Sequence, residues 1–103
     1  MQVFASIRDR PTWVTGRPRS WRGAEPSEPG AKQLSFGFDI TDDGAGNFLL
    51  VCFSADGAYG ADTWHQTLSE AYASAEEQFG VRCSEWRPPE QGEPRVAPDP
   101  RRQ

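Results

Sequence analysis

The most regular alternation of apolar and polar residues lies in LSFGFDIT, residues 34–41. Successive side chains of a strand point to opposite faces, so this pattern predicts a strand with one apolar face. The residues predicted to face inward are Leu34, Phe36, Phe38 and Ile40. Residues 2–8 alternate less strictly and predict a second short strand. The segment DDGAGN, residues 42–47, consists of residues that favour turns.

A continuous apolar run, FLLVCFS, follows at residues 48–54. Its length and its flanking turns predict a central strand that is buried on both faces. After a second turn, DTWHQ at residues 62–66 predicts a short edge strand, and VRCSEW at residues 81–86 predicts a last strand.

A helical pattern occupies the region between these last two segments. Apolar residues recur with helical spacing and form one stripe, composed of Leu68, Ala71, Tyr72, Ala75 and Phe79. Thr67 and Glu70 form a T-x-x-E capping box, which makes Thr67 the predicted N-cap. Gly80 is placed to end the helix in the left-handed conformation. We therefore predict one helix over about residues 68–79.

These elements predict a small α+β domain, with an antiparallel sheet of three to five strands and the helix packed on one face. All nine prolines lie within residues 11–29 or 88–100. We predict a single domain over residues 1–87 that includes a long basic Pro/Gly/Arg-rich loop or arm at residues 9–33. Residues 88–103 are expected to be a disordered tail.

The predicted sheet has a second face that one helix cannot cover. Two alternatives remain open for the apolar side chains on that face. Trp13 and Trp21 from the 9–33 segment could cover it, or a second copy of the chain could do so in a homodimer.

The net charge of −4 is distributed unevenly along the chain. Residues 1–32 carry six basic and three acidic side chains, whereas residues 33–81 carry eight acidic side chains and no lysine or arginine. The predicted folded part is therefore acidic. No run approaches the roughly 20 apolar residues of a membrane helix, so no membrane partner is expected. The first ten residues lack a signal-peptide pattern. The spacing of Cys52 and Cys83 indicates two free thiols and a cytoplasmic protein.

Two candidate sites for chemistry have simpler structural explanations. Asp62, His65 and Cys83 could form the nucleophile, base and orienting group of a small enzyme, but His65 is more simply a surface or edge residue before the helix, and Cys83 a core residue. Asp39, Thr41, Asp43 and Gly44 match the first half of a calcium loop, but Leu50 stands where a bidentate glutamate is required. We therefore predict a plain turn, no metal, no cofactor and no enzymatic activity.

Arginine and tryptophan are interleaved in RDRPTWVTGRPRSWRG, residues 8–23. Such a pattern suits phosphate contacts combined with base stacking. A nucleic-acid-binding accessory protein is therefore the alternative function, and the four arginines assigned to it are Arg10, Arg17, Arg19 and Arg22. The acidity of residues 33–81 opposes nucleic-acid binding.

The segment TLSEA, residues 67–71, follows strands and a glycine-containing turn and resembles the strand-to-helix junction of HicB-like antitoxin domains. The resemblance spans residues 48–81, which are also similar to small uncharacterised bacterial proteins. Trp64, His65 and Gln66 interrupt the family's pattern, its Pro-Gly-Cys turn is absent, and no DNA-binding helical motif follows. The resemblance therefore implies the shape of the junction and no functional residues.

The exposed acidic face of the helix suits a basic protein partner. We therefore predict a non-enzymatic protein–protein interaction or regulatory module. The residues predicted to bind a partner are Glu70, Glu76, Glu77, Trp13 and Trp21. The partner is expected to be a basic protein or a second copy of the chain.

Overall fold

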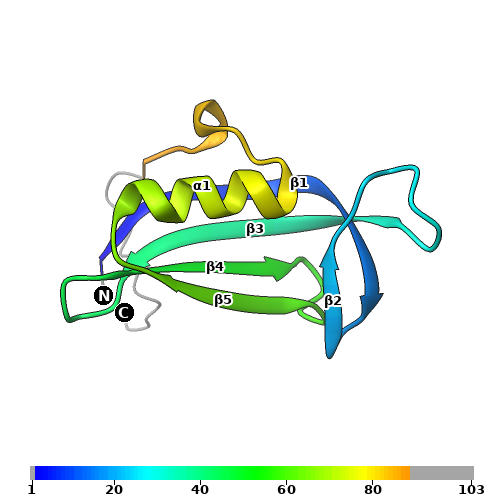
Figure 1. Cartoon of the computed structure of the whole chain (residues 1–103), viewed down its shortest axis with the longest axis horizontal. Coiled ribbons are helices and arrows are strands. Elements are labelled where there is room, and N and C mark those ends of the chain that lie inside the picture. The colour runs from blue at the N-terminus through cyan, green and yellow to red at the C-terminus, as the bar shows by residue number, and fades with distance from the viewer. Residues whose placement is uncertain (1, 89–103) are drawn as a thin grey trace.

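The computed structural model describes residues 2–88 as a five-stranded antiparallel sheet with one α-helix and one short 3-10 helix (Figure 1). The strands are β1 (Val3–Arg17), β2 (Ser20–Gly23), β3 (Lys32–Asp42), β4 (Phe48–Ser54) and β5 (Gly60–His65). The helix α1 (Leu68–Phe79) and the 3-10 helix η1 (Cys83–Glu85) follow. The predicted α+β class is confirmed. No helix within residues 2–88 is long and apolar enough to cross a membrane.

The strands lie in the order β2-β1-β3-β4-β5. β3 occupies the middle of the sheet, and β4 lies between β3 and β5, as predicted for a central strand. The predicted edge strand is also present, because β5 ends the sheet. On β4 only one face is fully buried, through Leu50, Cys52 and Ser54, whereas Leu49, Val51 and Phe53 are partly buried. The prediction that β4 is buried on both faces is therefore only half correct.

The prediction of a loop or arm at residues 9–33 is wrong for most of that segment. Residues 9–17 continue β1, residues 20–23 form β2, and residues 24–31 connect β2 to β3. Proline is compatible with a strand where the strand lies at an edge. Pro11 meets this condition, because β1 pairs with β2 only through Val14–Arg17. Its other side pairs with β3 at Ser35.

A bulge explains why the alternation in β1 is difficult to recognise. The register between β1 and β3 shifts between Ile7 and Arg10, and Asp9 within the bulge has a φ of 55°. An extra residue in one strand bends it and reverses which side chains face inward. Thr12 and Val14 are consequently buried on the same side of the sheet as Ile7. Strict alternation from Ile7 would have placed both of them on the other side.

One buried cluster connects the sheet to the helix. Its buried members come from three strands, the turn before β5, the helix and the segment after it: Ile7, Val14, Phe36, Phe38, Ile40, Leu50, Cys52, Tyr59, Ala71, Ala75 and Val81. The inward residues predicted for 34–41 are thereby confirmed, with Leu34 partly buried against the cluster.

Trp21 packs against this same cluster. Its ring centroid lies 5.4 Å from that of Phe36, 5.7 Å from Tyr59 and 5.9 Å from Phe79. Phe36 pairs with Ser54, so it shares a face with Leu50 and Cys52 rather than with Val51. The alternative that Trp21 covers the second face of β4 is therefore wrong.

The helix has the predicted bounds and caps. Thr67 Oγ1 accepts a hydrogen bond from the backbone N–H of Glu70 at 3.1 Å. The Glu70 carboxylate accepts from the N–H of Gln66 at 3.0 Å, one residue before the donor of a standard capping box. Gly80 ends the helix with a φ of 74°, a conformation that glycine adopts without strain.

The segment after the helix differs from the prediction. Residues 83–85 form η1 rather than a strand, and only a single bridge joins Arg87 to Ser6, with backbone hydrogen bonds of 2.9 and 3.0 Å. Cys83 is exposed, so the prediction that it is a core residue is wrong. Its position on a short surface turn keeps it away from the sheet. Apart from Pro88, the predicted disordered tail lies outside the described residues.

Candidate interaction groove

A groove of about 480 Å³ lies between the C-terminal end of α1 and the start of the β2–β3 connection. It is lined by Arg10, Pro11 and Trp13 of β1, by residues 22–26 and Glu28, by Gln33 of β3, and by Glu76–Gly80 at the end of the helix. The ionisable residues that line it are Arg10, Arg22, Glu25, Glu28, Glu76 and Glu77. The groove therefore collects charged side chains from three segments that are distant in sequence.

Close packing between β2 and the helix brings the walls together. An added Cβ at Gly23 would lie 2.0 Å from the carbonyl oxygen of Gln78 and 3.0 Å from the Phe79 ring. Any side chain larger than hydrogen would therefore collide with the helix backbone. Gly23 thus fixes how closely the last turn of α1 approaches the β2–β3 connection.

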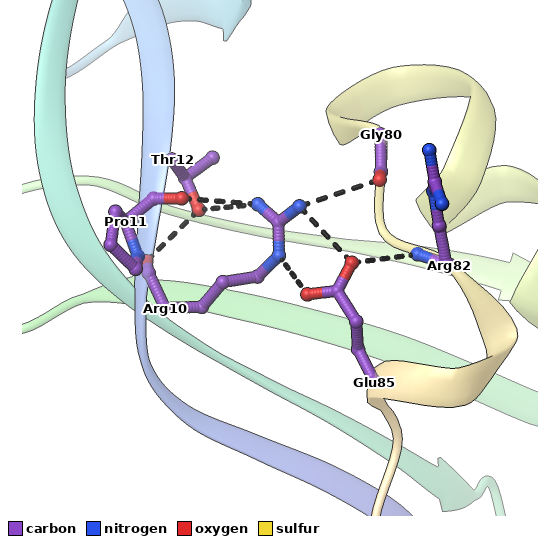
Figure 2. A network of polar contacts seen from close by, with 6 residues as sticks. All are labelled: Arg10, Pro11, Thr12, Gly80, Arg82 and Glu85. Carbon is purple, nitrogen blue, oxygen red and sulfur yellow. Dashed lines mark hydrogen bonds and ion pairs between the residues drawn. The ribbon is translucent and has the colours of Figure 1, made fainter.

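Arg10 forms the end of the groove and is fully engaged within the protein (Figure 2). Its Nε donates to Glu85 Oε1 at 2.6 Å, and its Nη2 donates to Glu85 Oε2 and to the Gly80 carbonyl, both at 3.3 Å. It also donates to Thr12 Oγ1 and to the Pro11 carbonyl, both at 3.2 Å. Arg10 therefore ties β1 to the end of the helix and to η1.

The Glu85 carboxylate is held in place from two sides. Besides Arg10, the backbone N–H of Arg82 donates to its Oε2 at 2.9 Å (Figure 2). The hydrogen bond from Arg10, with a smaller contribution from the Arg82 N–H, keeps the pKa of Glu85 below its ordinary value. Glu85 therefore remains ionised and neutralises Arg10.

A second ion pair neutralises Arg22. Its guanidinium donates to Glu28 at 2.6 and 3.3 Å, and the N–H of Glu25 donates to the same carboxylate at 2.9 Å. The hydrogen bond from Arg22 and then the one from the Glu25 N–H lower the pKa of Glu28. Both arginines of the groove thus have carboxylate partners from this chain.

The remaining carboxylates of the groove have no such partner. Among residues 2–88, the ion pairs involve Arg8, Arg10 and Arg22, and none of them engages Glu25, Glu76 or Glu77. These three glutamates are exposed. Glu76 and Glu77 also stand near the C-terminal end of α1, whose last turn has no basic residue. The helix dipole is negative at that end, so the local potential favours a cation.

The structure brings some of the predicted binding residues together and separates others. Trp13, Glu76, Glu77, Arg10 and Arg22 all line the groove. Trp13 is partly buried there, and its carbonyl accepts the N–H of Ala24 at 2.9 Å.

The other predicted binding residues lie outside the groove. Glu70 is at the opposite end of the helix, where it serves as part of the cap. Trp21 belongs to the interior cluster. Arg17 and Arg19 are exposed beside the turn between β1 and β2.

Sequence reasoning missed the segment of Glu25 and Glu28 as part of the candidate site. The turn itself could have been predicted from the sequence, because Pro26 follows Glu25 and proline favours the second position of a turn. In the structure the N–H of Glu28 donates to the Glu25 carbonyl at 3.0 Å and closes this turn. Its position beside the helix end depends on the β1–β2 hairpin, which the sequence pattern did not reveal.

Two of the three residues of the enzyme alternative, Asp62 and His65, do not face each other. Asp62 pairs with Val51 and His65 with Phe48 across the β4–β5 ladder, so the two side chains lie on opposite faces of the sheet. His65 Nε2 lies 2.7 Å from Thr63 Oγ1. Cys52, which is not part of that alternative, is buried, and burial raises the pKa of its thiol to about 11.

The acidic turn at 42–47 uses its carboxylates internally. Asp43 Oδ1 accepts the N–H groups of Ala45 at 2.8 Å and Asn47 at 2.9 Å, and these bonds lower the pKa of Asp43. The predicted turn between two strands is confirmed. In the described part of the chain, no three His, Cys, Asp or Glu residues are grouped so that they could hold a metal ion.

No protein-family model, curated protein or solved structure matches this chain. The resemblance of residues 48–81 to HicB-like domains therefore stays a prediction. The function must be argued from the groove and from the surface of the sheet.

Proposed function

We propose that the protein is a non-enzymatic interaction module that binds a basic segment of a partner protein in the groove. The observation that carries this proposal is the charge balance of the groove. Its two arginines are neutralised by Glu85 and Glu28, while Glu25, Glu76 and Glu77 have no ion-pair partner among residues 2–88.

The groove suits lysine or arginine side chains for two physical reasons. The carboxylates and the C-terminal end of the helix dipole add their negative potentials at one place. Trp13 and Phe79 also line the groove and offer aromatic surface to the alkyl stem or charged head of a basic residue. In this arrangement the helix lies against one face of the sheet and keeps Glu76 and Glu77 exposed.

Nucleic acid fits this surface less well. Two of the four arginines assigned to it, Arg10 and Arg22, are already paired. Arg17 and Arg19 remain available, but the nearby glutamates repel phosphate. We also place the site of action in the cytoplasm, because Cys52 and Cys83 are free thiols, as expected in a reducing compartment.

A peptide titration tests the proposal. A fluorescent peptide composed of arginine, lysine and glycine is titrated with the full chain, and its anisotropy is followed at low and high ionic strength. We expect saturable binding that weakens with salt, because exposed charges are screened. An oligothymidine probe of the same length should bind at least about tenfold more weakly.

Variants locate the binding surface. Glu76→Gln with Glu77→Gln removes two negative charges from the groove and should weaken peptide binding by about tenfold. Ser69→Lys with Ala45→Lys changes the net charge equally at exposed positions away from the groove. If both double variants weaken binding equally, only net charge matters and the groove is not the site. Tighter binding of the oligothymidine probe would favour the nucleic-acid alternative.

A further inference from the structure

The outer edge of β5 carries a second unexplained surface. Trp64 is 53% exposed and is the only exposed large hydrophobic residue in the described part of the chain. β5 pairs with β4 on one side, and no other strand of residues 2–88 pairs with its outer side (Figure 1). An edge strand presents a row of backbone N–H and C=O groups to which another strand can bind.

The edge of β5 lacks most of the features that normally prevent such pairing, and Asp62 is its one acidic side chain. Natural edge strands are protected by lysine, proline, a bulge or a covering segment. Residues 60–65 contain neither lysine nor proline, and their register with β4 runs without a shift. The outer side of β1 is different, because β2 covers Val14–Arg17 and Arg87 bonds to Ser6.

The Trp64 side chain is already held in position. Its indole Nε1 donates to Asp43 Oδ2 at 3.0 Å. An aromatic group fixed in this way loses little conformational entropy when a partner covers it. Its cross-strand partner is the partly buried Leu49, and the partly buried Val51 lies on the same face. Apolar surface therefore continues from β4 to the free edge.

We infer that this edge pairs with β5 of a second copy around a two-fold axis. The axis makes the two strands antiparallel and satisfies both free edges at once. If Asp62 lay on the axis, two carboxylates would face each other, which is destabilising.

If Thr63 lies on the axis, Asp62 of one copy faces Trp64 of the other. The two indoles then become diagonal neighbours at about 7–8 Å between backbones, within reach of aromatic side chains. This register also places two threonines opposite each other, a favourable cross-strand pair.

This dimer does not depend on the proposed function. The groove is built from β1, the residues after β2 and the end of α1, whereas β5 is at the other end of the strand order. Peptide binding and self-association can therefore succeed or fail separately.

Sedimentation of the full chain over a range of concentrations tests the inference. We expect the mass to rise from that of one chain to that of two, and the association to strengthen with salt, because each copy carries a net charge of −4. Trp64→Lys should weaken dimerisation by at least about tenfold. Ala73→Lys adds the same charge at an exposed helix position and should behave as the parent chain.

Hydrogen exchange provides a second readout that does not need a variant. Outward-pointing amides of β5 should exchange at least about tenfold more slowly at high than at low protein concentration, whereas the amides of β2, at the other edge of the sheet, should not change. A chain that remains monomeric at all concentrations overturns the inference, even if β5 binds another protein. A dimer without protection of β5, or one that Trp64→Lys leaves intact, overturns it as well.

Discussion

Replacing Arg10 by alanine should destabilise the protein, whereas replacing Arg22 should not change its stability measurably. Both arginines form an ion pair of 2.6 Å with a glutamate. The Arg10 and Glu85 side chains are only 19% and 31% exposed, but the Arg22 side chain is 65% exposed. An exposed pair contributes little, because water and salt screen it and two flexible side chains must be ordered.

The expected effect of Arg10→Ala follows from the bonds it removes. The guanidinium makes two bonds to Glu85 and further bonds to Gly80 and Thr12. Loss of a charged hydrogen-bond partner costs about 1.5–3 kcal/mol when the group is buried. Because water reaches part of this pair, we expect a loss of about 1–2 kcal/mol in the free energy of unfolding. For a domain of this size, each kcal/mol lowers the Tm by about 4–8 °C.

A double-mutant cycle measured by urea unfolding separates the pair from its surroundings. Arg10→Ala, Glu85→Ala and the double variant should give a coupling energy of about 1 kcal/mol. The matched cycle on Arg22 and Glu28 should give no resolvable coupling. The reasoning is refuted if the exposed pair is coupled as strongly as the Arg10–Glu85 pair, or if neither is coupled.

Three further predictions follow from individual contacts. The pKa of Glu85 is lower in the folded protein than in the unfolded chain. Ionised Glu85 therefore stabilises the fold fully above the unfolded pKa of about 4.3, and this contribution is lost as the pH falls through the folded pKa. The stability advantage of the parent chain over Glu85→Gln should therefore shrink in thermal melts at acid pH. Gly23→Ala should destabilise by about 1–3 kcal/mol in thermal melts, whereas Gly60→Ala, whose Cβ would have 3.6 Å to its nearest neighbour, should be tolerated. Phe79→Ala should cost about 2–3 kcal/mol because Phe79 is only partly buried, and more than His65→Ala; the reverse order of melting temperatures would contradict the packing of the helix.

The helix α1 and the strands β3 and β4 were predictable because the local sequence signals agree with one another there. The stripe from Leu68 to Phe79 has helical period, Thr67 and Gly80 cap its ends, and residues 34–41 alternate strictly. Each of these features depends on residues within a few positions of one another. Their agreement left no competing local structure.

β1 could not be predicted beyond residue 8, because the evidence for it is not local. The bulge at Asp9 reverses the alternation, and Pro11 argues against a strand unless its neighbours are known. That proline is acceptable only because β2 pairs further along β1. The same limitation hid the groove, whose Arg10–Glu85 pair joins residues 75 positions apart in the chain.

The proposed function rests on the acidic end of the helix. A helix that needed only to be stable would carry lysine or arginine in its last turn, where cations offset the dipole. Here Glu76 and Glu77 occupy the end of α1 and have no ion-pair partner among residues 2–88, although Arg10, paired with Glu85, donates to the Gly80 carbonyl at that end. A local rule that the fold compensates only in part, as it does here, is typical of a functional surface. The missing positive charge is what a basic partner would supply.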